Sequence, residues 1–135
     1  ILLGEDYKEG PYTREYVEDI LVRLGKLGPK KVVLTGVYFS KGLTGAAAYS
    51  RDIDEVSYAF SQKVSGNYHG TGDIFASALL AGLLNGHKLN IALQLAADFT
   101  SGSIRRTKEI GTDPRFGVNF EAGLFKFMRE LGLEK

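Results

Sequence analysis

The sequence predicts an α/β domain, in which helices pack against a sheet. Three observations indicate this class: an amphipathic helical pattern near the start, a glycine–proline turn after it, and then a short β-branched run. Helix, tight turn and buried strand in this order are typical of α/β architecture. The length of 135 residues fits one domain with a core of its own.

The first helix is expected to begin after Thr13 and to run to about Lys26. A threonine side chain can cap the free N–H groups of a helix start. Apolar side chains then recur at helical spacing: Tyr16, Val17, Ile20, Leu21 and Leu24. Gly28-Pro29 is the kind of turn that ends a helix.

Three strands are expected next. The run KVVLTGV, from Lys31 to Val37, is apolar and β-branched, which indicates a strand buried on both faces. The segments 45–50 and 55–61 flank the polar turn RDID and predict a hairpin. In the second of these segments apolar and polar residues alternate, so we expect a half-buried strand.

Three further helices are expected. The segment from about Gly72 to Asn85 is apolar almost all round, which predicts a buried helix, with Gly86 at its end. A long helix is predicted from about residue 90 to residue 108. Asn119 is then a candidate cap for a last amphipathic helix.

The composition excludes several classes of protein. With 44% hydrophobic and 24% charged residues and a net charge of +1, the chain has no footprint for nucleic acid or membrane binding. It has no cysteine, which excludes disulfides and fits a cytoplasmic protein. Its apolar runs are far shorter than the ~20 residues that span a bilayer. The first residue is not methionine and lies in an apolar run, so we expect a piece of a longer polypeptide.

The stretch YHGTGDI, residues 68–74, is the candidate functional motif. Gly70 and Gly72 would let the backbone adopt positive φ and approach a ligand closely. A glycine turn at a helix start presents N–H groups that form an anion site. The motif is not a Walker A loop, because Asp73 and Ile74 replace lysine and serine or threonine, and Phe75 breaks the dinucleotide fingerprint.

Asp73 has two interpretations. A carboxylate in the first helical turn is favourable to the helix dipole by roughly 0.3–1 kcal/mol and needs no other role. A carboxylate beside an anion site can also accept a proton from an attacking hydroxyl while the amides hold a transferring phosphoryl group. The spacing alone leaves both interpretations open.

Three separated segments, YHGTGDIFASALLAGLLNG, ALQLAADFTSGSIRRT and GTDPRFGVNFE, resemble in order the C-terminal part of the ribokinase-like superfamily, and more narrowly bacterial pyridoxamine/pyridoxal kinases. The resemblance covers nearly the whole chain. It implies a ribokinase-like sheet flanked by helices, of which residues 1–135 form a single partial domain, the nucleotide-binding C-terminal half.

The resemblance also implies roles for particular residues. Gly70, Thr71 and Gly72 would form the anion hole, and Asp73 would be the base that deprotonates the 5′-hydroxymethyl group of a vitamin B6 vitamer. Thr35, Gly36, Ala97 and Ser101 would contact the nucleotide, although packing alone also explains such small residues. ATP and Mg²⁺ would be required, the metal arriving with the nucleotide and without protein ligands of its own in this chain.

The chain departs from the family pattern at its start. The family's N-terminal portion, which supplies the first strands, most of the vitamer pocket and the lid, has no counterpart here, so Glu5 is not given a magnesium or phosphate role. We expect this chain alone to be inactive, and the full-length enzyme to be a homodimer. A hydroxymethylpyrimidine or sugar kinase of the same superfamily, or a non-catalytic nucleotide-binding remnant, are the alternatives.

Other polar residues have mainly structural interpretations. His69 is either loop filling or a phosphate contact. Arg105 and Arg106 are expected at a solvated helix end, with a phosphate clamp as the alternative. Asp113, before a proline, is expected to form a turn. The loop residues Lys41 and Lys63 cannot be told from surface charge, and Asp98 is either exposed or hydrogen-bonded.

Overall fold

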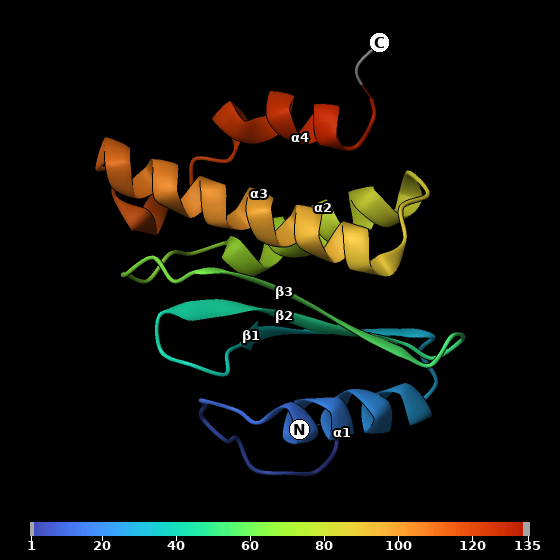
Figure 1. Cartoon of the computed structure of the whole chain (residues 1–135). Coiled ribbons are helices and arrows are strands. Elements are labelled where there is room, and N and C mark those ends of the chain that lie inside the picture. Colours follow the sequence, from blue (N-terminus) through green and yellow to red (C-terminus); the bar gives the residue numbers. More distant parts are fainter. Residues whose placement is uncertain (1, 134–135) are drawn as a thin grey trace.

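The computed structural model describes residues 2–133, which form a small sheet between helices. Its helices and strands are α1 (Arg14–Lys26), β1 (Lys31–Val37), β2 (Leu43–Ser50), β3 (Glu55–Gln62), α2 (Thr71–Leu84), α3 (Leu89–Ile110) and α4 (Leu124–Glu130). Figure 1 shows α1 on one face of the sheet and α2 and α3 on the other, with α4 outside α3. The predicted α/β class is therefore confirmed. No helix within the described residues is long and apolar enough to cross a bilayer.

The sheet has the order β1-β2-β3, and both pairs are antiparallel. The predicted hairpin is confirmed, with Gly45 opposite Phe60 and Ser50 opposite Glu55. The register of β1 on β2 shifts between Thr35 and Val37. Gly36 lies at this shift with φ of 72°, a left-handed conformation that disfavours any residue with a side chain.

The central strand β2 is buried on both faces. Ala46 and Ala48 belong to the core under α2 and α3, whereas Ala47 and Tyr49 belong to the core over α1. Small alanine side chains let the layers approach closely. At Gly45 the approach is closer still, because an added Cβ would lie 1.9 Å from the carbonyl oxygen of Ala59.

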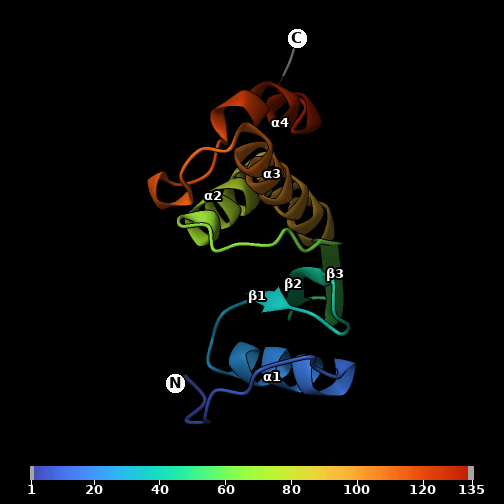
Figure 2. The ribbon, with the colours of Figure 1, turned by 90° about the vertical axis from the view of Figure 1, so that its left-hand side faces the viewer.

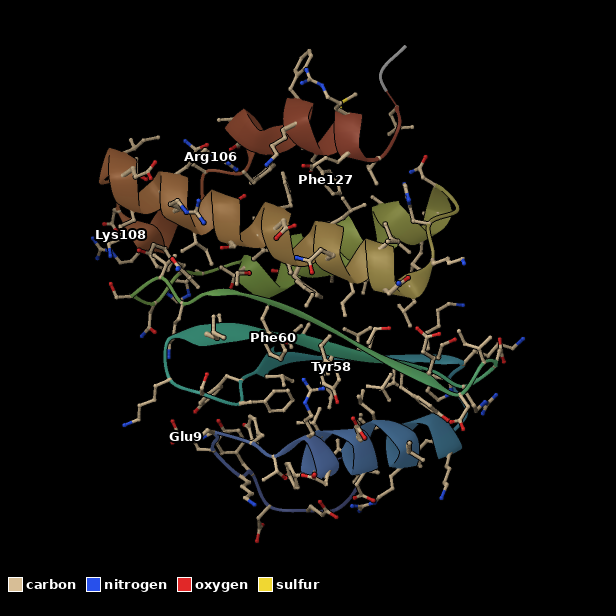
Figure 3. The ribbon with its side chains drawn as sticks, in the orientation of Figure 1. Glu9, Tyr58, Phe60, Arg106, Lys108 and Phe127 are labelled. Carbon is tan, nitrogen blue, oxygen red and sulfur yellow. The ribbon has the colours of Figure 1, made fainter. Side chains whose placement is uncertain are left out.

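The helix α1 forms where the sequence predicts it. The Thr13 hydroxyl accepts the N–H of Tyr16 at 3.3 Å, so the predicted cap is confirmed. Val17 and Leu21 are buried against the sheet. From β3, Tyr58, which is labelled in Figure 3, donates its hydroxyl to Glu18 of α1 at 2.7 Å.

The predictions about strand burial fail in part. Val32 and Val37 are buried in the core over α1 and Val33 packs against the other core, but β1 is an edge strand of the described sheet, and Thr35 and Gly36 are exposed. β3 is not half-buried, because Ala59, on the face opposite Tyr58 and Phe60, is only 1% exposed. Helices cover both faces of β3, so alternation in its sequence separates aromatic from small residues rather than buried from exposed ones.

The prediction that α2 is buried is also wrong. It packs mainly against α3, with Phe75, Ala78 and Gly82 buried, while Leu80 and Leu84 are 55% and 78% exposed. Figure 2 shows α3 over β3 and α2 displaced toward the β1 side. Within residues 2–133 nothing covers the outer face of α2. Its start at Thr71 and the left-handed Gly86 after its end agree with the sequence.

The last predicted cap is wrong as well. Asn119 caps no helix, because α4 begins only at Leu124, after a short 3-10 turn over Glu121–Gly123. Instead, the backbone of Asn119 is held by side chains of α3. The predicted helix over residues 90–108 is confirmed and extends slightly at both ends, with a left-handed Gly111 as its C-cap.

Candidate functional site

The loop that begins α2 presents free amide groups. Gly70 is the N-cap, with φ of 76° and ψ of 1°, and its carbonyl accepts the N–H of Ile74 at 3.1 Å. The amides of Thr71, Gly72 and Asp73 therefore precede the first intrahelical hydrogen bond, and Gly70 has no side chain to cap them. Such a helix end carries partial positive charge and favours an anion.

Only one of the two glycines needs its special backbone freedom. Gly70 adopts positive φ as predicted, but Gly72 does not, because it already lies within the first turn of α2. No atom lies within 4 Å of a Cβ built on Gly72. The lack of a side chain at Gly72 therefore leaves open space beside the free amides.

One face of this loop borders a cavity of about 620 Å³, here called the first cavity. The predicted anion-hole residues Thr71 and Gly72 line it. The predicted nucleotide contacts all line it too: Thr35, Gly36, Ala97 and Ser101. The structure thus brings residues from β1, α2 and α3 around one space large enough for a small-molecule ligand. Their role in nucleotide binding stays a prediction.

The first cavity has further lining residues that sequence reasoning did not select. They are polar residues from strand ends and from the loop before the motif: Thr44, Ser61, Gln62 and Asn67. Thr44 lies 27 residues before Thr71, where α2 begins, and the pairing of β2 with β3 brings it to this edge. Tyr68 and Thr100 also line this cavity; Tyr68 belongs to the motif, and Thr100 lies between the predicted contacts Ala97 and Ser101.

Asp73 lies on the other side of the loop. Its exposed side chain lines a second cavity of about 450 Å³, together with Gly70, Ile74, Thr112, Asp113 and the segment 116–121. His69 lines both cavities, and Gly70 only the second. Within residues 2–133 no ion pair involves the Asp73 carboxylate. The loop thus separates the first cavity, which the predicted nucleotide contacts line, from the second cavity, which the predicted base Asp73 lines.

The far wall of the second cavity is fixed by two side chains of α3. Arg106 donates from Nε to the carbonyl oxygen of Asn119 at 3.1 Å, and Thr107, which is fully buried, accepts the Asn119 N–H at 2.8 Å. A Cβ on Gly123 would lie 2.3 Å from the Arg106 guanidinium, so a larger residue there would displace the Arg106 side chain. The predicted solvated role of Arg106, labelled in Figure 3, is therefore wrong, whereas Arg105 is exposed.

The same wall contains the predicted turn at Asp113. The Arg115 backbone N–H donates to Asp113 at 2.9 Å, which confirms the turn. The Arg115 guanidinium also donates to both carboxylate oxygens, at 2.6 to 3.1 Å. These side-chain hydrogen bonds, with the backbone one, lower the pKa of Asp113. The Asp113 carboxylate therefore forms an ion pair with Arg115.

The loop before the motif is tied to α3. Lys108, labelled in Figure 3, donates to the Ser65 hydroxyl at 2.9 Å, and Tyr68 donates to the Ser65 carbonyl at 3.1 Å. Lys63 lines the first cavity, with Nζ 6.0 Å from the centre of the Tyr38 ring, whereas Lys41 does not line either cavity. Asp98 is exposed and accepts from Gln94 at 3.0 Å.

Neither cavity presents a metal centre built from this chain. Within residues 2–133 no group of three or more histidine, cysteine, aspartate or glutamate side chains could hold an ion. The donor set of the first cavity is amides, hydroxyls, one histidine and one lysine, which suits the oxygens of phosphates and of a nucleoside rather than a bare cation.

The chain is similar to a known protein family and to solved structures. Residues 2–117 match the family model of phosphomethylpyrimidine kinase. A crystal structure from Bacteroides thetaiotaomicron VPI-5482, assigned as a phosphomethylpyrimidine kinase, superposes with a TM-score of 0.85 at 30% identity, over 99% of this chain and 44% of that one. A second crystal form, with pyridoxal, gives 0.79 at 28% identity, over 99% and 46%. A search of curated proteins gives no significant match.

Pyridoxal kinase from Lactobacillus plantarum is also similar, with a TM-score of 0.81 at 26% identity, over 95% of this chain and 45% of that one. The chain thus spans less than half the length of these structures. The expected fold, that of a ribokinase-like vitamin B6 kinase over part of its length, is confirmed. The chain belongs to the phosphomethylpyrimidine kinase family.

Proposed function

We propose that this chain is the nucleotide-binding and base-bearing part of an ATP-dependent kinase that phosphorylates the 5′-hydroxymethyl group of a vitamin B6 vitamer. One observation carries the proposal: the loop 70–73 lies between two cavities, with Thr71 and Gly72 bordering one and Asp73 bordering the other. Phosphoryl transfer needs a donor and an acceptor on opposite sides of the transferred group, and this loop has a cavity on each side.

In the proposed reaction the Asp73 carboxylate accepts the proton of the attacking hydroxyl in the second cavity. The new O–P bond forms at the γ-phosphorus as the bond to the β,γ-bridging oxygen breaks, and ADP leaves. The amides of Thr71 and Gly72 donate hydrogen bonds to the charge on the transferring group. Mg²⁺, held by the nucleotide phosphates, would neutralise part of their charge. Within residues 2–133 no cation pairs with the Asp73 carboxylate.

The related structures support the proposed acceptor. One of these structures is a crystal form with pyridoxal, and another is that of a pyridoxal kinase. The family model, however, is named for phosphomethylpyrimidine kinase, which favours hydroxymethylpyrimidine as the second candidate acceptor. A sugar kinase or a non-catalytic nucleotide-binding remnant has no such support. We also propose a cytoplasmic, homodimeric full-length enzyme, on the family resemblance alone.

Nucleotide binding by the 135-residue chain tests the proposal. We expect weak binding of MgATP by isothermal titration calorimetry and negligible phosphorylation of pyridoxal by this chain alone. Lys63→Met should weaken MgATP binding severalfold, because Lys63 lines the first cavity, whereas the matched Lys41→Met should not. Absence of MgATP binding would refute a nucleotide-binding role. Robust turnover of pyridoxal would refute the view that the chain is only part of the catalytic unit.

A further inference from the structure

Among the residues that the structure describes, His69 is the one that lines both cavities. It lies in the turn directly before Gly70, the N-cap of α2. In the proposed reaction the phosphoryl group starts on the first-cavity side of the loop 70–73 and ends on the second-cavity side. A residue that borders both cavities is therefore placed beside the path of the transferred group.

The scaffold makes no use of the His69 side chain. It is exposed, and within residues 2–133 its ring has no hydrogen-bond or ion-pair partner. The other histidine of the chain, His87, differs: its Nε2 lies 3.3 Å from the carbonyl oxygen of Leu131, and it lines neither cavity. The ring of His69 is therefore able to bond to an occupant of either cavity, and the ring of His87 is not.

The two cavities carry charged groups of opposite sign. Lys63 and the neutral hydroxyl of Tyr68 line the first cavity. Three carboxylates line the second cavity: Asp73, Asp113 and Glu121. Arg115 pairs with Asp113, whereas Asp73 has no such partner within residues 2–133, so its carboxylate and the phosphates of a nucleotide would repel each other. A protonated imidazole between them attracts both, and histidine is the side chain that gains this charge near neutral pH.

We propose that His69 contacts the phosphoryl group as it passes between the cavities, donating a ring N–H to one of its oxygens. The inference rests on the proposed function, in which Asp73 remains the base. His69 accepts no proton from the acceptor hydroxyl, and no bond to its ring forms or breaks. Its contribution is largest when both ring nitrogens carry protons, because hydrogen bonds from a charged donor to a phosphate are stronger than neutral ones.

Proton NMR of the 135-residue chain tests the contact, because the sequence has only two histidines and the His69→Gln variant assigns their signals. The titration midpoint of each ring is measured without ligand, with MgATP and with AMP. We expect MgATP to raise the midpoint of His69 by about 0.5 pH unit, which corresponds to about threefold tighter binding to the protonated ring. AMP, which lacks the β- and γ-phosphates, should leave this midpoint unchanged, and His87 should respond to neither ligand.

Calorimetry on matched variants tests the same contact through affinity. At pH 6, His69→Gln should weaken MgATP binding about threefold, and at pH 8, where histidine is neutral, it should have little effect. His87→Gln is the control, because it removes the same titrating group away from both cavities and should leave MgATP binding unchanged at either pH. The titration of the nucleotide itself is common to all three proteins, so it cancels in the comparison.

The outcomes are distinguishable. If MgATP binds but the His69 midpoint does not move, the inference is wrong and the proposed nucleotide-binding role stands. An equal shift with AMP would place His69 beside the α-phosphate or the nucleoside and overturn the inference. An equal shift at His87 would show a general effect of charge and overturn it too. Absence of MgATP binding by the unsubstituted chain would overturn both the inference and the proposed function.

Discussion

Replacing Gly72 by alanine should have opposite effects on the stability of the chain and on its affinity for ADP. Gly72 lies in the first turn of α2 without positive φ, and an added Cβ meets no atom within 4 Å. Alanine is a better helix former than glycine by up to about 1 kcal/mol, and near a helix end about half of this is realistic. We therefore expect Gly72→Ala to stabilise the chain by about 0.5 kcal/mol.

The size of the thermal shift follows from the chain length. Unfolding entropy of about 2.1 cal/mol/K per residue gives roughly 0.28 kcal/mol/K for a chain of this size. A gain of about 0.5 kcal/mol then raises Tm by about 2 °C. The same methyl group enters the space beside the free amides of α2, so we expect ADP binding to weaken at least about tenfold.

Circular dichroism and calorimetry on the same samples measure the two effects. Gly70→Ala is the control, because it makes the same chemical change where φ is 76°. A left-handed alanine costs about 1 kcal/mol, so its Tm should fall by about 3 to 4 °C. A fall in the Tm of Gly72→Ala would refute our account of its backbone, and unchanged ADP affinity would refute the role of the open space.

Three further predictions concern the scaffold. Gly45→Ala should disrupt the hairpin, since its Cβ would lie 1.9 Å from a backbone oxygen of β3; circular dichroism that shows an unchanged Tm would contradict this. Burial and the hydrogen bond to Glu18 raise the pKa of Tyr58 to about 12, so the folded state holds its proton more tightly than the unfolded chain. Stability from this group is full below pH 10 and is lost as pH rises toward 12, and Tyr58→Phe should flatten that part of the pH–Tm curve; an identical slope would refute it. Thr107→Val leaves the partly buried Asn119 N–H without its acceptor and should destabilise the chain by about 1 kcal/mol, with faster hydrogen exchange at Asn119; unaltered exchange would show that another group holds this segment.

Local features of the fold could be predicted from the sequence because they depend on neighbours in the chain. Thr13 caps α1 through a contact three residues away, and the hairpin is set by a four-residue turn. The burial of α2 could not be predicted, because an apolar pattern does not say which of its faces meets another element. The edge position of β1 depends likewise on strand order, which the sequence does not state.

The local parts of the candidate site could also be predicted from the sequence, and the parts that depend on distant segments could not. The glycine loop and its helix start are local, and the structure places Thr71 and Gly72 beside the other predicted nucleotide contacts. The placement of Asp73 in a separate cavity is not local, since that cavity exists only because the segment 112–121 folds back beside α2. Arg106 was misassigned for this reason: its partner, Asn119, lies 13 residues away.

The most direct test of the central claim is Asp73→Asn in a full-length form of the kinase, with kcat for pyridoxal and the Kd for MgATP measured on the same protein. Asparagine keeps the size and polarity of the side chain but cannot accept the hydroxyl proton. We predict a fall in kcat of about 10²- to 10⁴-fold with a nearly unchanged Kd for MgATP, because Asp73 borders the second cavity and not the first. Unchanged kcat would contradict the assignment of Asp73 as the base.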